Sequence, residues 1–146
     1  MRSLMLLVSL SFPLVFSTTF SQKSPVVPFD TLSISCLVFA TADEPIVISA
    51  LSQYKQLEWH KKGAVCAEWP QIDFEKKILV GHSIQFGGCR DPITETTIRQ
   101  VGGDFLATMK IHENGVCRML IRKTYWFILD KPTQDNFKIS FTNEYN

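Results

Sequence analysis

The chain has 146 residues, of which 45% are hydrophobic and 20% charged, and its formal net charge at pH 7 is +1. This length suits one domain with a hydrophobic core of its own. The near-neutral charge gives no electrostatic reason to expect nucleic acid or an anionic membrane surface as a partner. We therefore predict no nucleic-acid binding.

The N-terminus has the pattern of a cleavable signal peptide. Arg2 is the only charge in the first 21 residues, and an interrupted apolar run follows at 4–16. That run is too short to span a bilayer, which needs about 20 apolar residues. The small side chains of Thr19 and Ser21 suit cleavage before Gln22. We expect 1–21 to be removed, which makes the mature chain secreted or periplasmic, without a stable membrane span. An uncleaved anchor is the alternative.

Export changes the interpretation of the four cysteines. An even number in an oxidising compartment favours disulfides, and four cysteines allow three pairings. We favour Cys36–Cys66 and Cys89–Cys117, because each bond closes a loop of about 30 residues and contributes about 3 kcal/mol in the chain-entropy model. The sequence alone does not establish this connectivity.

After the leader, residues 22–28 predict an extended segment that enters a single domain at 29–146. Residues 30–40 are rich in Ser, Ile, Leu and Val and predict a first strand. A turn and a short strand at 46–48 follow. We then expect the one amphipathic helix of the chain, from residue 50 to about residue 62.

Capping and periodicity define this helix. Ser49 is a good N-cap, because its hydroxyl can accept a hydrogen bond from a backbone N–H of the first turn. Lys61 and Lys62 suit the C-terminal end of the helix dipole, and Gly63 is a stop signal. The apolar side chains that share one face, within an arc of about 120°, are Ala50, Leu51, Tyr54 and Leu57.

The rest of the chain has the periodicity of strands. Apolar and polar side chains alternate, as in half-buried antiparallel strands, at 80–86, 105–111 and 137–141. Residues 94–101 predict a weaker edge strand, and 102–104 a hairpin turn. Residues 122–129 are apolar on both faces, which predicts a central strand that ends at 130–132. The predicted fold is α+β: one amphipathic helix packed on a curved antiparallel β-sheet of about six to seven strands.

No catalytic pattern stands out. His60, His82 and His112 each lie five to seven residues before a cysteine, whereas zinc ligands usually form local pairs. His82 falls on the apolar face of its strand, which favours a buried, hydrogen-bonded histidine. We therefore predict no catalytic residue, cofactor or metal. A small hydrolase or metal-dependent enzyme built on these histidines and the thiols is the alternative. A binder of carbohydrate or another small ligand is a third hypothesis.

The most distinctive local feature is Gly87-Gly88-Cys89-Arg90. Two glycines after an alternating strand permit positive φ angles and close backbone approach. One interpretation is a bulge or turn that positions Cys89 for its bond. The other is an exposed rim loop, with Gly87, Gly88 and Arg90 as a partner-binding loop.

Short segments along most of the mature chain follow a known order. Residues 45–49 precede a helix with Gln53-Tyr54, residues 72–80 carry Asp-Phe and then a hydrophobic strand, and the glycine pair follows. This order resembles the PrcB-like C-terminal domain family, named for a bacterial protease-complex accessory subunit. The family commonly has Thr-Gly-Gly-Tyr where this chain has Phe86 to Cys89, so the chain resembles a divergent, cysteine-containing branch. The resemblance implies an exported, non-catalytic domain that binds a protease or another envelope protein. A protease inhibitor is a variant of this hypothesis.

Overall fold

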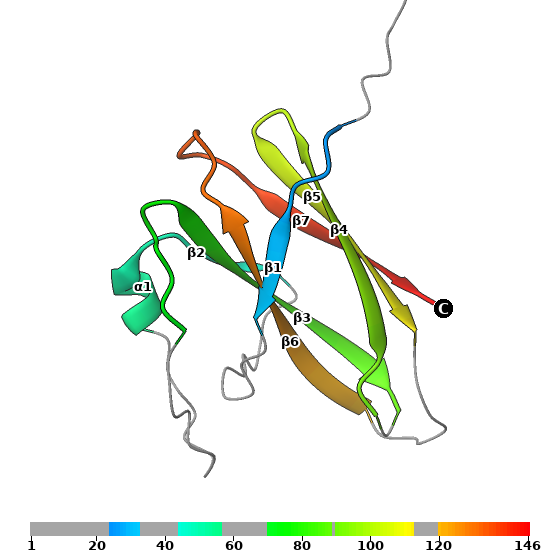
Figure 1. Cartoon of the computed structure of the whole chain (residues 1–146). Coiled ribbons are helices and arrows are strands. Elements are labelled where there is room, and N and C mark those ends of the chain that lie inside the picture. Colours follow the sequence, from blue (N-terminus) through cyan, green and yellow to red (C-terminus); the bar gives the residue numbers. More distant parts are fainter. Residues whose placement is uncertain (1–23, 33–43, 57–69, 89, 113–119) are drawn as a thin grey trace, which may run out of the picture.

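Seven strands and one short helix make up the described part of the chain. The computed structural model describes residues 24–32, 44–56, 70–88, 90–112 and 120–146. The predicted leader, the four cysteines and His60 lie outside these ranges. The elements in chain order are β1 (Phe29–Leu32), β2 (Ile46–Ile48), α1 (Leu51–Lys55), β3 (Lys77–Gly87), β4 (Ile93–Val101), β5 (Asp104–His112), β6 (Leu120–Asp130) and β7 (Ile139–Tyr145), as Figure 1 labels them.

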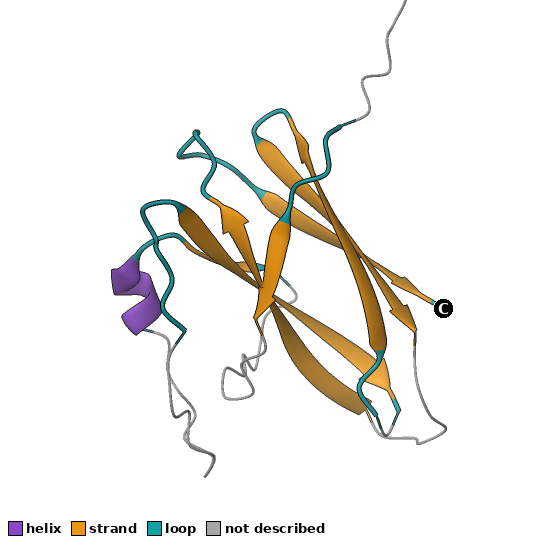
Figure 2. Ribbon diagram, in the orientation of Figure 1, coloured by secondary structure: helices purple, strands orange, loops and turns teal. Residues whose placement is uncertain are grey.

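The strands form two sheets, so the prediction of a single curved sheet was wrong. A four-stranded sheet has the order β1-β6-β3-β2, and a three-stranded sheet has the order β4-β5-β7. The first is antiparallel, whereas β7 runs parallel to β5, contrary to our prediction. The fold is mostly β, with α1 at one end beside β2 (Figure 2). The physical reason is that β3 and β6 carry apolar side chains on both faces, so their sheet needs a covering layer on each side.

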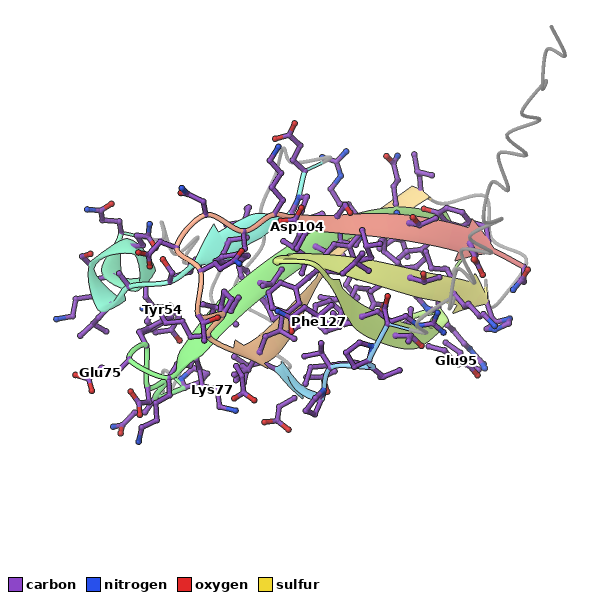
Figure 3. All side chains as sticks on the ribbon, turned by 90° about the horizontal axis from the view of Figure 1, so that it is seen from above. Tyr54, Glu75, Lys77, Glu95, Asp104 and Phe127 are labelled. Atoms are coloured by element: carbon purple, nitrogen blue, oxygen red, sulfur yellow. The ribbon has the colours of Figure 1, made fainter. Side chains whose placement is uncertain are left out.

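The main hydrophobic core lies between the two sheets. Phe127 points into it from β6 (Figure 3). The predicted alternation at 80–86 and 105–111 is confirmed, because the apolar positions of both stretches are buried. Burial of each large apolar side chain among them contributes roughly 1.5–3 kcal/mol. The buried members of this core are Ile78, Val80, Ile84, Phe86, Ile98, Phe105, Ala107, Met109, Ile111, Phe127, Leu129 and Ile139.

A smaller core covers the outer face of the four-stranded sheet. Tyr54 packs against Phe74 with ring centroids 5.3 Å apart, and its hydroxyl donates to the Pro70 carbonyl at 3.1 Å. Trp126 lies over Gly81, where an added Cβ would approach the indole to 2.6 Å. Glycine therefore lets the indole pack directly on the backbone of β3. The buried members of this cluster are Ile48, Tyr54, Phe74, Leu79 and Trp126.

The helix differs from the predicted one at its start. Within the described residues it covers only Leu51–Lys55, with Ala50 as the N-cap. Ser49 makes no cap through its hydroxyl; instead its backbone N–H donates to Gln53 Oε1 at 2.8 Å. Leu51 is 52% exposed, so the predicted apolar face was wrong at this residue. The predicted continuation at 57–62 lies outside the described residues.

Several strand predictions are confirmed by pairing. The strand at Ile46–Ile48 has the predicted bounds. Central strand β6 lies between β1 and β3 and ends at Asp130, and β4 lies at the edge of its sheet. The hairpin between β4 and β5 is confirmed by the pair Val101–Asp104. Gly102 adopts φ 64° there, in the left-handed region that favours glycine.

The two sheets meet along two seams. On one side, residues 25–32, which we call the N-terminal strap, cross from β4 to β6. The Val27 N–H donates to the Ile98 carbonyl at 2.8 Å, the Gln100 N–H donates to the Pro25 carbonyl at 3.2 Å, and β1 then pairs with β6. On the other side, which we call the β3–β7 seam, the contacts between the two strands come from side chains.

Candidate functional site

The predicted partner-binding loop lies where the chain crosses from one sheet to the other. Gly87 is the last residue of β3 and pairs with Leu120, the first residue of β6. The connection to β4 follows, at the end of the molecule where β6 begins (Figure 1). Gly88 is buried with φ 143°, a backbone conformation that L side chains rarely adopt. The expected positive φ is therefore confirmed at Gly88.

Side chains anchor this connection, which also carries the exposed cation Arg90. Asp91 Oδ2 accepts a hydrogen bond from Lys123 Nζ of β6 at 2.5 Å, and the two side chains are 69% and 39% exposed. Such an exposed pair contributes about 0.2–1 kcal/mol, so it orients the connection more than it stabilises the fold. Pro92 is buried, whereas Arg90 is exposed. The connection thus presents Arg90 from an anchored backbone.

Two large apolar side chains are exposed at the same end of the molecule. Leu120 is 68% exposed at the start of β6, and Ile93 is 62% exposed at the start of β4. We call Arg90, Ile93 and Leu120 the rim site. The predicted exposure of the loop is wrong at Gly88, which is buried, and Gly87 is half-buried. Sequence reasoning missed the two apolar members of the rim site. A signal was present for Leu120, because it shares its strand face with polar Arg122 and Thr124.

The three histidines of the enzyme hypothesis do not form a described cluster. His82 is buried between the sheets, whereas His112 falls on the outward face of β5, opposite Ile93. His60 lies outside the described residues. Ser83 points to the opposite face of β3 from His82, and its hydroxyl is 2.9 Å from that of Thr124. Within the described ranges, no group of three or more His, Cys, Asp or Glu side chains could hold a metal.

The prediction of a buried, hydrogen-bonded His82 is confirmed. Its side chain is 4% exposed, and Nε2 lies 3.0 Å from Asn143 Oδ1 on β7. The ring stacks on Phe141 with centroids 4.1 Å apart and planes 9° from parallel. Burial lowers the pKa of His82, and the hydrogen bond to Asn143 opposes this effect. His82 thus joins the sheets as a neutral imidazole near pH 7.

Comparison with known proteins gives no relative. No protein-family model, no curated protein and no solved structure matches this chain. The resemblance to the PrcB-like family therefore stays a prediction. Among the described residues, no helix is long and apolar enough to cross a membrane.

Proposed function

We propose that this chain is an exported, non-catalytic protein-binding module that contacts its partner through the rim site. The observation that carries the proposal is the exposure of Leu120 and Ile93 at the end of the molecule that presents Arg90. Apolar side chains surrounded by polar ones are typical of protein–protein contact surfaces. Arginine is enriched in such surfaces, because one side chain offers both a charge and an apolar stem.

The backbone that follows Arg90 supports a preorganised contact. Asp91 binds Lys123, and Pro92 is buried. A segment that is already ordered loses little conformational entropy on binding, so more of its contact energy appears as affinity. We therefore expect the partner surface to place an apolar residue against Leu120 or Ile93 and a carboxylate against Arg90.

The partner class that we propose is a protease or another envelope protein. The support is the resemblance to the PrcB-like family and the predicted signal peptide, which would deliver the chain to that compartment. In a variant of this proposal, the chain inhibits the protease by occupying its active site through the rim loop. Assays against cysteine, serine and metalloproteases test the variant, since an inhibitor must slow at least one of them.

A cross-linking pull-down tests the proposal. The purified protein serves as bait for an envelope or secreted fraction, and Leu120→Asp is compared with Leu106→Asp. Leu106 is the matched control, because it is also exposed (48%) but lies near the opposite end of β5 from His112. We expect the wild type and Leu106→Asp to recover the same protein and Leu120→Asp to lose it. Equal recovery by both variants, or none by the wild type, would contradict the proposal.

A further inference from the structure

The β3–β7 seam contains a buried titratable group. His82 faces β7 across the gap between the sheets, bound to Asn143 and stacked on Phe141. Beyond this contact, the Tyr145 hydroxyl donates to the Gln85 carbonyl at 3.2 Å. These side-chain contacts link β7 to β3, and the only titratable group among them that changes charge between pH 5 and pH 8 is the imidazole.

The hydrogen bond determines which nitrogen would take up a proton. Asn143 Oδ1 can only accept, so His82 Nε2 carries the hydrogen and Nδ1 is the basic nitrogen. Nδ1 is buried and has no hydrogen-bond partner within the described residues. A proton on Nδ1 would therefore create a buried charged donor that has no acceptor among the described residues.

Apart from the hydrogen bond to Asn143, the described surroundings of His82 offer such a charge no compensation. On the inward face of β6, the titratable groups nearest to His82 are Tyr125, its register partner, and the cation Lys123. On β7, Tyr145 binds Gln85, and on the inward faces of β4 and β5 the described residues carry no ionisable side chain. The nearby carboxylate Asp91 is already paired with Lys123. Protonation would thus be opposed by burial.

We propose that the β3–β7 seam is an acid-sensitive latch, in which protonation of His82 at Nδ1 separates β7 from β3 while the N-terminal strap stays bound. The imidazolium gains hydration only if the seam opens, since its ring is covered on one side by Phe141. The strap contains no histidine and is held by backbone hydrogen bonds, which do not titrate. One side of the sandwich should therefore open before the other.

The direction of the pH effect follows from linkage. The pKa of His82 in the folded protein lies below the ordinary histidine value of about 6.5. Its contribution to stability is therefore present above about pH 6.5 and is lost as the pH falls toward the folded-state value. In this window a single proton can lower the folding equilibrium constant by up to about tenfold per pH unit.

Urea unfolding of the purified protein at pH 7.5 and pH 5.5 tests the latch. We expect the wild type to lose stability at pH 5.5 and His82→Phe, which keeps an aromatic ring beside Phe141, to lose much less. His112→Gln on the outward face of β5 is the matched control and should respond as the wild type does. Equal pH dependence in the wild type and His82→Phe would overturn the proposal.

If His82→Phe does not fold, two measurements on the wild type test the latch. Separation of β7 from β3 would expose the backbone pairing of β7 with β5 to water, so the protection factors of β7 amides in hydrogen exchange should fall at pH 5.5. Those of Val27 and Gln100, whose amides form the bonds between the N-terminal strap and β4, should persist. An NMR titration of the His82 ring should give a midpoint below the ordinary histidine range. An equal loss of protection at both seams, or a midpoint at or above that range, would refute the latch.

Discussion

On one side of this sandwich a strap of backbone joins β4 to β6, whereas on the other side β3 and β7 meet through the side chains of His82, Asn143 and Tyr145. Both seams join the two sheets, but they depend on different chemistry. Backbone bonds do not titrate and form with any residue except a proline donor, whereas a buried imidazole loses its contribution when it is protonated. The comparison teaches that one fold can combine a seam whose stability does not depend on pH with one whose stability does.

The largest expected effect comes from the residue that contacts both seams. Phe127 packs edge-on against Phe29 of the strap, with centroids 5.5 Å apart. It also packs against Phe141 of β7 in a tilted arrangement, with centroids 5.7 Å apart. Phe127→Ala should lower the free energy of unfolding by about 3–5 kcal/mol, because it leaves a cavity in the main core. Urea denaturation measures this loss. A change below about 1 kcal/mol would show that the sheets do not depend on this side chain.

A smaller effect is expected from removing one backbone bond of the strap. Val27→Pro deletes the N–H that donates to the Ile98 carbonyl at 2.8 Å, in a buried part of β4. We expect a loss of about 1–3 kcal/mol, because the carbonyl is left without its partner. Val27→Ala keeps the N–H and serves as the control for lost packing. Equal destabilisation by both variants would show that packing, and not the backbone bond, closes this seam.

The smallest effect is expected at the outer end of the β3–β7 seam. Tyr145→Phe removes the hydroxyl that donates to the Gln85 carbonyl at 3.2 Å and keeps the ring. Since Tyr145 is 50% exposed, water can replace the lost donor, and we expect a loss of about 0.5–1 kcal/mol. Faster hydrogen exchange in β7 than in the strap should accompany it. If hydrogen exchange in β7 did not change, the contact between β3 and β7 would depend on His82 and Asn143 and not on the Tyr145 hydroxyl.

Local pattern predicted the individual strands well and their assembly poorly. The alternation at 105–111 identifies β5 because strand side chains have a period of two residues, and the glycines at 102–103 mark the hairpin. In contrast, the parallel pairing of β7 with β5 joins segments about 34 residues apart and leaves no mark in either segment. The predicted helix begins one residue too early, because the backbone N–H of Ser49 donates to Gln53 and its hydroxyl does not act as the cap.

The features of the candidate site also divide into those that the sequence predicted and those that only the structure revealed. The glycine pair and Arg90 were visible in the sequence, and the positive φ of Gly88 is what glycine permits. The exposure of Leu120 and Ile93 was not visible, because whether an apolar residue is covered depends on which strands lie beside it. For the same reason, burial of His82 could be predicted from its strand face, but its partner Asn143 could not.

The sequence by itself determined which stretches are extended, where β4 turns into β5, that β6 is covered on both faces, and that His82 points inward. Only the tertiary structure decided that the strands divide into two sheets, that residues 25–32 bind both of them, and that β7 is held to β3 by side chains. The physical reason is range: the direction of a side chain follows from its own strand, whereas the choice of neighbouring strand depends on the burial and hydrogen bonding of the whole chain.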